Sequence, residues 1–137
     1  MWASHLISAD IYKNSWYSIV AETDHRYFFF TEKTAKCLLA KRIFLYMAAL
    51  YQLKLLREYG FKTFDGIIDE SYDNEPKFYK RAKMIEEQIK FLSSSDPVKL
   101  YEQAMPILDH NFNLIKDMSW QINNVKNFIQ THLNRLK

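Results

Sequence analysis

Thr31, Glu32 and Lys33 follow a run of aromatic residues and precede residues with helical periodicity. This order predicts that the chain enters a helix at Thr31. The first amide hydrogens of a helix lack intrahelical partners and the helix dipole favours negative charge, so a phosphate group can bind there. Lys33 would stand in the first turn, where a cation is unfavourable for the bare helix. A local violation of this kind often marks a functional residue.

The same three residues also fit an ordinary helix start. Thr31 would then be the N-cap, and the charge of Glu32 would be favourable in the first turn. Lys33 would be a solvated surface residue. The two interpretations differ in whether the helix binds a ligand, and the residues alone leave both open.

Glu22 stands at the end of another apolar stretch. Residues 15–21 are rich in aromatic and β-branched side chains, which is typical of a strand buried on both faces. Ligands of open α/β sheets bind at the carboxyl ends of the strands, so Glu22 would face a bound ligand. His25, in the polar loop that follows, is a candidate base, but without an identifiable partner it also fits a solvent-exposed loop histidine.

Asp69, Glu70 and Asp73 bring three carboxylates together within five residues. A divalent cation could use such a group. The spacing lacks the calcium-loop signature and no histidine accompanies it, so we predict no metal site. Instead we expect Asp73 or Asn74 to cap the helix that follows Pro76.

Strands and helices alternate over residues 15–75. A strand, a crossover helix and a second strand form a right-handed parallel unit. Gly60 lies where a left-handed C-cap would end the second helix. In chain order, the pattern predicts a strand over 15–21, a helix over 31–41 with Ala35, Leu38 and Leu39 buried, a strand over 42–47, a helix over 49–59, and a third strand or an extended segment over 61–64.

Residues 76–137 change character and predict helices. Asp96 is a cap followed by a proline at the first helical position, which opens a short helix to Ala104. An amphipathic helix is expected over 77–92, with Met84, Ile85, Ile89 and Leu92 on one face. After Pro106 apolar residues recur at heptad-like spacings: Leu108, Ile115, Met118, Ile122, Val125, Ile129, Leu133 and Leu136. This seam fits either a long helix packed along its own domain or a self-association surface.

The size and composition are those of one globular domain over residues 1–137. Hydrophobic residues make up 48% of the 137 residues and charged residues 26%. The net charge of +3 is weak, and the basic residues form no cluster, so we expect no nucleic-acid partner. The predicted fold class is α/β. A small Rossmann-like half-sheet of two to three parallel strands (15–75) would carry a helical C-terminal extension (76–137).

One cysteine, Cys37, excludes an internal disulfide and a cysteine-based zinc site. Its apolar neighbours predict an inert buried thiol. No stretch reaches the ~18 to 20 apolar residues that cross a bilayer, and residues 1–5 lack the charged region of a signal peptide. We therefore expect a cytoplasmic protein without a membrane span.

Residues 16–23 and 27–44 together resemble the donor-binding segment of the α-1,3-fucosyltransferase-like glycosyltransferases and of a related phage-type group. In that family a strand ending in Glu is followed by a Thr/Ser-Glu-Lys helix start and then by a second strand. In the phage-type group the tract continues much as 55–64 and 69–73 do here. The resemblance covers roughly residues 15–95, within about the first two-thirds of the chain.

This resemblance implies a site for a nucleotide-sugar donor such as a GDP- or UDP-sugar, without a metal or another cofactor. The implied donor-binding residues are Glu22, Arg26, Thr31, Glu32 and Lys33. Lys33 and the amides of residues 31–33 would face the pyrophosphate, and Glu32 would bind ribose hydroxyls. Transfer to a glycan acceptor would be an inverting displacement, for which Glu22 is the only carboxylate we offer as the base.

The matched tract begins only about 15 residues from Met1, so we expect the acceptor-binding half of such an enzyme to be missing here. A separate chain would then supply it. Two function classes stay open. One is a glycosyltransferase-like donor-binding domain that forms part of an enzyme. The other is a non-catalytic interaction protein, which a phage could encode and which would use its C-terminal helix to hold a partner or a second copy.

Overall fold

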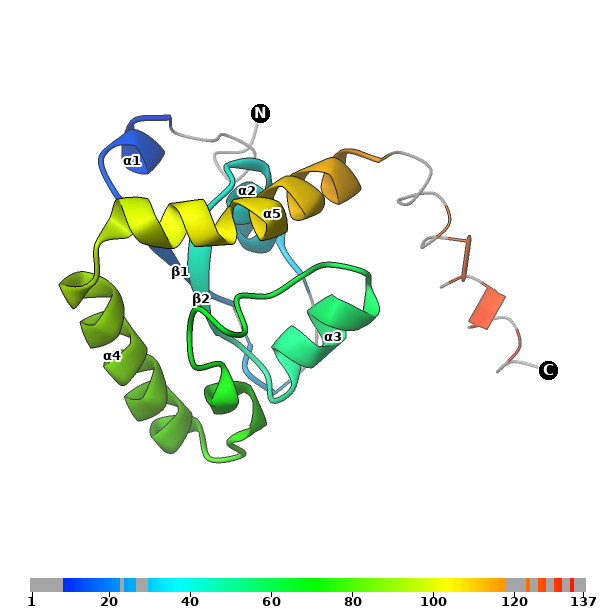
Figure 1. Ribbon diagram of the computed structural model, residues 1–137. Coiled ribbons are helices and arrows are strands. Elements are labelled where there is room, and N and C mark those ends of the chain that lie inside the picture. Colours follow the sequence, from blue (N-terminus) through cyan, green and yellow to red (C-terminus); the bar gives the residue numbers. More distant parts are fainter. Residues whose placement is uncertain are drawn as a thin grey trace.

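The computed structural model describes residues 9–22, 24–26 and 30–117, and a few separate positions after them. Two parallel strands lie at the centre, and helices from later in the chain pack around them (Figure 1). The elements in chain order are α1 (Ala9–Lys13), β1 (Tyr17–Ala21), α2 (Glu32–Leu39), β2 (Ile43–Met47), α3 (Gln52–Glu58), a short 3-10 helix (Ser71–Asn74), α4 (Phe78–Ser94) and α5 (Pro97–Lys116).

The predicted α/β class, with a small parallel half-sheet and a helical C-terminal extension, is confirmed. β1 pairs with β2 in register, from Tyr17 opposite Ile43 to Ala21 opposite Met47. The prediction that β1 is buried on both faces is wrong, since Ile19 is 52% exposed. The reason is that α4 and α5 pack chiefly against β2, which is buried along almost its whole length.

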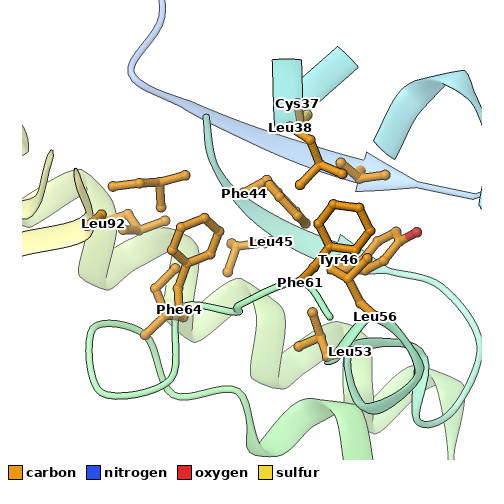
Figure 2. Packing of buried hydrophobic residues seen from close by; sticks show 14 of the residues in the cluster. Cys37, Leu38, Phe44, Leu45, Tyr46, Leu53, Leu56, Phe61, Phe64 and Leu92 are labelled. Atoms are coloured by element: carbon orange, nitrogen blue, oxygen red, sulfur yellow. The ribbon is translucent and has the colours of Figure 1, made fainter. Parts of the chain in front are cut away.

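The hydrophobic core lies between β2 and the helices. Figure 2 shows Phe44, Leu45 and Tyr46 of β2 among apolar side chains from the helices and from residues 61–64. The Phe44 ring packs edge-on against Tyr46 and Phe64, with ring centres 5.8 and 5.4 Å apart. Removing these large apolar surfaces from water is the main stabilising term of such a core.

Three helix ends follow the signals read from the sequence. Thr31 is the N-cap of α2, and its Oγ1 accepts a hydrogen bond from the Lys33 amide at 3.2 Å. Asp96 caps α5 in the same way, with its Oδ1 3.0 Å from the Val98 amide nitrogen. Gly60 follows α3 with a φ of +93°, the left-handed conformation that favours glycine. These local predictions are confirmed.

The prediction of a short helix that ends at Ala104 is wrong, because α5 continues through Pro106 to Lys116 without interruption. Leu100, Ala104 and Leu108 are all buried and recur every four residues, so one core-facing stripe continues across the proline. Pro106 itself is exposed, and water can bond the helical carbonyl that a proline leaves without a donor. Packing of the stripe therefore outweighs the local cost of the proline.

Residues 61–64 are extended, but they do not join the sheet, which has two strands among the described residues. Asn111 of α5 binds both backbone groups of Lys62, with Oδ1 2.8 Å from the amide nitrogen and Nδ2 2.8 Å from the carbonyl oxygen. Glu70 Oε1 accepts the Phe64 amide at 2.8 Å. Side chains thus satisfy the backbone groups that a third strand would have paired.

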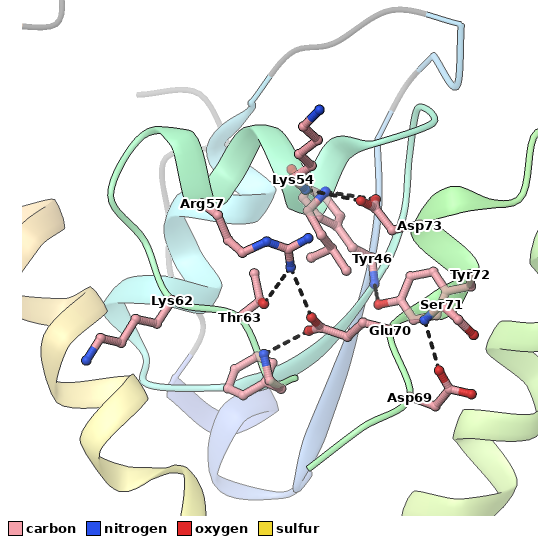
Figure 3. Close-up of polar contacts among 12 residues, drawn as sticks. Tyr46, Lys54, Arg57, Lys62, Thr63, Asp69, Glu70, Ser71, Tyr72 and Asp73 are labelled. Carbon is pink, nitrogen blue, oxygen red and sulfur yellow. Dashed lines mark hydrogen bonds and ion pairs between the residues drawn. The ribbon is translucent and has the colours of Figure 1, made fainter. Parts of the chain in front are cut away.

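Asp73 caps α3, so the prediction that it leads into the following helix is wrong. Its two carboxylate oxygens accept the amides of Leu53 at 2.8 Å and Lys54 at 3.1 Å (Figure 3). Tyr51, at the N-cap of α3, has a φ of +62° and makes no side-chain cap. A carboxylate from the 3-10 helix therefore takes that role.

Leu39, predicted to be buried, lies at the surface with an exposure of 37%, and Ile89, predicted to share a face with the buried Ile85 and Leu92, is 36% exposed. Thr34 and Cys37 occupy the buried side of α2 beside Leu38. In the predicted seam, Leu108 is buried and Ile115 packs against the core, whereas its members from Met118 onward lie outside the described residues. Among the helices that the structure describes, none has both the length and the apolar character to span a membrane.

Candidate functional site

Glu22 directly follows β1, and its carboxylate lies at the N-terminus of α2. Oε1 accepts the Thr31 amide at 3.3 Å and the Thr34 hydroxyl at 2.8 Å. Oε2 accepts the Thr31 hydroxyl at 2.7 Å, and the Tyr46 hydroxyl donates to Oε1 at 3.1 Å. A negative charge therefore occupies the place where the sequence predicts an anion, but it belongs to the chain itself.

The donors around Glu22 come from simple local spacings. Thr31 and Thr34 are three residues apart, so their hydroxyls share one side of the first turn of α2. Tyr46 is the last but one residue of β2 and pairs with Val20, which brings its side chain close to the carboxyl edge of the sheet. Sequence reasoning missed Thr34 and Tyr46. Two hydroxyls at this spacing and a polar side chain near a strand end are the signals that could have revealed them.

Lys33 also reaches the carboxyl end of β1, where its Nζ lies 3.0 Å from the Ala21 carbonyl oxygen. The Glu22 amide donates to β2, so the backbone groups of Ala21 point away from β2. Lys33 thus covers a carbonyl at the outer edge of the sheet. Arg42 does the same at the other end of β1, with Nη2 3.0 Å from the Tyr17 carbonyl oxygen. Cations at a strand edge discourage pairing with another chain.

Arg26 makes contacts within its own loop, and His25 packs against α4. Arg26 pairs with Asp24, with Nε 3.0 Å from Oδ1 and Nη2 2.8 Å from Oδ2. The hydrogen bonds from Arg26 lower the pKa of Asp24 to about 2. The His25 ring packs on Phe78, with ring centres 4.5 Å apart. Arg26, which the resemblance implies as a residue that binds the nucleotide-sugar donor, therefore lies in an ion pair at the surface.

A cavity of about 480 Å³ lies beside the N-terminus of α2. Thr31, Glu32 and Thr34 line it from α2, while Phe30 and Tyr59 meet edge to face with ring centres 5.5 Å apart. Its other lining residues are apolar and come from α2, α3, the segment after α3 and the end of α5: Ala35, Leu38, Leu55, Leu56, Phe61 and Ile115. A mostly apolar cavity with a few polar groups is typical of small-molecule sites.

The predicted residues therefore divide into three groups. Glu22, Thr31 and Lys33 meet at the carboxyl end of β1. Glu32 is exposed and lines the adjoining cavity. Arg26 pairs with Asp24.

A second polar group lies beyond α3, and Figure 3 shows its geometry. Arg57 Nη1 lies 2.8 Å from Thr63 Oγ1 and 3.3 Å from Glu70 Oε2. Burial raises the pKa of the Glu70 carboxyl. These contacts hold the segment after α3 in place. No set of histidine, cysteine and acidic residues in the described part of the chain is grouped to hold a metal ion.

Comparison of the chain with protein-family models, with curated proteins and with solved structures found no match. The resemblance to glycosyltransferases therefore stays a prediction that rests on short motifs. What the site binds has to be inferred from its own geometry.

Proposed function

We propose that this chain is a glycosyltransferase-like domain that binds a nucleotide sugar at the N-terminus of α2 and in the adjoining cavity. The observation that carries the proposal is the meeting of Glu22, Thr31 and Lys33 at the carboxyl end of β1. Open α/β sheets bind their ligands at this edge. The cavity beside it is large enough for a nucleoside.

Each part of a nucleotide has a matching group at the site. The nucleobase is aromatic and would enter the apolar cavity beside Phe30 and Tyr59. Glu32, exposed at the cavity, would accept hydrogen bonds from the ribose hydroxyls. Lys33 would exchange the Ala21 carbonyl for a phosphate oxygen, which gains a charge-assisted hydrogen bond.

Glu22 restricts where the diphosphate can lie. Its carboxylate already binds the Thr31 amide and would repel a phosphate at that position. The diphosphate would therefore lie toward Lys33, and Glu22 would face hydroxyl groups of the sugar. In this position Glu22 is also the group that could deprotonate a glycan acceptor. Because the acceptor side would come from a separate chain, we expect the isolated protein to show little or no transferase activity.

Replacing Lys33 by alanine tests this proposal. Lys33→Ala should weaken the binding of GDP, UDP or their sugars at least about tenfold, because a charge-assisted hydrogen bond contributes about 1.5 to 3 kcal/mol. Titration calorimetry measures the effect directly. Lys36→Ala is the matched control, since Lys36 carries the same charge one turn further along α2 and should change affinity less than about twofold.

Two results would count against the proposal. No heat from the wild-type protein with any of these nucleotides at millimolar concentration would reject it as a whole. Equal affinities of the wild type and Lys33→Ala would reject the role of Lys33.

A non-catalytic interaction protein is the second candidate function. It is favoured by one observation, namely that Glu22 already neutralises the N-terminus of α2 while Lys33 binds a carbonyl of the chain. The half-sheet would then serve stability, and the C-terminal helical extension would hold a partner or a second copy. Sedimentation of the purified chain distinguishes the two. A dimer that binds no nucleotide would favour this candidate.

A further inference from the structure

The Tyr46 hydroxyl of β2 contacts polar side chains from three other parts of the fold. It lies 2.5 Å from Thr34 Oγ1 of α2 and 3.1 Å from Glu22 Oε1 after β1. Gln52 Nε2 of α3 donates to it at 3.4 Å. Tyr46, Thr34 and Gln52 are each no more than 2% exposed. Buried polar groups that touch in this way restrict one another's orientation.

The directions of these hydrogen bonds all lead to the Glu22 carboxylate. The amide nitrogen of Gln52 can only donate, so the Tyr46 oxygen accepts from it. The Tyr46 proton then points to Thr34 or to Glu22, and the Thr34 proton goes to Glu22 Oε1. Burial raises the pKa of the Tyr46 phenol, which keeps this proton on the ring oxygen. In both arrangements the hydroxyl protons lead toward the ionised Glu22 carboxylate, which stabilises the network as a whole.

Oε1 and Oε2 of Glu22 are occupied to different degrees. Among the described residues, Oε1 accepts the Thr31 amide and the hydroxyls of Thr34 and Tyr46, whereas Oε2 accepts only the Thr31 hydroxyl. A carboxylate oxygen has two lone-pair sites. Oε2 can therefore accept one more hydrogen bond. The groups that donate to Oε1 set the orientation of the carboxylate and so the direction in which Oε2 points.

We propose that Tyr46 is a positioning residue, which fixes the Glu22 carboxylate across the N-terminus of α2 and keeps Oε2 available for a hydroxyl of the ligand. This inference rests on the proposed nucleotide-sugar site. Tyr46 acts through Glu22 and is absent from the lining of the adjoining cavity. Oε2 can accept a hydrogen bond from a neutral hydroxyl, such as those of a sugar ring, but not from an ionised phosphate.

Tyr46→Phe tests the role, because it removes the hydroxyl and keeps the ring in the core. Tyr72→Phe is the matched control. The Tyr72 hydroxyl is equally buried and accepts the Tyr46 amide at 3.3 Å, but it binds the backbone of β2 instead of Glu22. Both variants lose one buried hydroxyl, so their losses of stability should be similar.

The first measurement needs no ligand. The Thr31 amide reports on Glu22 because Oε1 accepts its hydrogen bond. Hydrogen exchange followed by NMR should show the Thr31 amide exchanging about fivefold to tenfold faster in Tyr46→Phe, after correction for global stability with buried amides of β2. Tyr72→Phe should leave the corrected rate unchanged. An unchanged Thr31 rate in Tyr46→Phe would overturn the proposal.

The second measurement is nucleotide binding by calorimetry with UDP, GDP and their sugars. Tyr46→Phe should weaken binding about tenfold, and Tyr72→Phe less than about twofold. Faster Thr31 exchange with unchanged affinity would overturn the positioning role toward the ligand. Absence of binding by the wild type would reject the proposed function, and the Thr31 exchange rate would then decide whether Tyr46 positions Glu22.

Discussion

Glu22 and Asp73 each bring a carboxylate from a distant segment to the N-terminus of a helix, but their surroundings differ. Asp73 is 4% exposed and binds two backbone amides of α3. Glu22 is only half-buried and binds one amide and three hydroxyls. The 3-10 helix covers the start of α3, whereas a cavity of about 480 Å³ adjoins the start of α2. The carboxylate at the start of α3 is therefore covered by protein, whereas the carboxylate at the start of α2 lies next to a cavity.

The kind of donor explains what this difference means for function. Backbone amides are fixed by the helix, so Asp73 has a single position that satisfies them. Hydroxyl groups rotate about their C–O bonds and can donate to another acceptor. The Thr31 hydroxyl at Oε2 of Glu22 can therefore turn toward a ligand while Thr34 and Tyr46 hold the carboxylate in place. The amides that Asp73 binds cannot turn in this way. This contrast supports a structural role for Asp73 and agrees with the binding role that we propose for Glu22.

Asp73→Ala should cause the largest effect and is the sharpest test of this contrast. It leaves the buried amide of Leu53 and the partly buried amide of Lys54 without their acceptor, and Tyr51 offers no side-chain cap in its place. The free energy of unfolding should fall by about 2 to 4 kcal/mol, as measured by urea denaturation. Asp69→Ala is the control, because Asp69 is exposed and should cost less than about 1 kcal/mol. A loss below about 1 kcal/mol for Asp73→Ala would refute the assignment.

Glu22→Ala should destabilise the fold less, by about 1 kcal/mol in the same assay. Thr31 and Thr34 line the cavity, where water can replace the lost carboxylate. The Tyr46 hydroxyl keeps Thr34 as an acceptor. If Glu22→Ala costs as much as Asp73→Ala, the two sites are equally structural and the contrast fails.

Glu70 extends the comparison to a pH dependence, with a smaller expected effect. Burial raises its pKa in the folded protein, so the folded state binds a proton more readily than the unfolded chain. The free energy of unfolding should therefore decrease as pH rises from about 4 through the folded pKa. Thermal unfolding of the wild type and of Glu70→Gln across this pH range isolates the contribution of the Glu70 carboxyl. The variant cannot titrate at this position, so it lacks this part of the pH dependence of stability. A wild-type stability that rises with pH relative to Glu70→Gln would contradict it.

The features of the fold that the sequence predicted correctly are those that depend on residues close together in the chain. The caps at Thr31 and Asp96 and the turn at Gly60 follow from side-chain chemistry within a few residues. The wrong predictions depend on distant packing. α5 continues through Pro106 because its buried stripe meets the core. Distant contacts also decide between the two alternatives left open for residues 61–64, which are extended and stay out of the sheet because Asn111 binds Lys62.

The candidate site divides in the same way. Glu22, Thr31 and Lys33 could be placed together because each follows directly from a strand end or a helix start. Tyr46 was missed because its position near a strand end, although a signal, does not show which groups its hydroxyl contacts. The cavity could not be predicted either, since Tyr59 at the C-cap of α3 and Ile115 of α5 reach it through tertiary packing.

The contacts of α5 have a consequence for the order in which the protein folds during its synthesis. Tyr101 donates to the Trp16 carbonyl, Asp109 pairs with Lys41, and Asn111 binds Lys62, over sequence separations of 85, 68 and 49 residues. None of these bonds can form before α5 has left the ribosome. The emerging strands therefore lack their final cover until α5 has been made, and contacts closed over such long loops are slow to form. A chain stalled before Pro97 would expose apolar β2 side chains to chaperones and proteases.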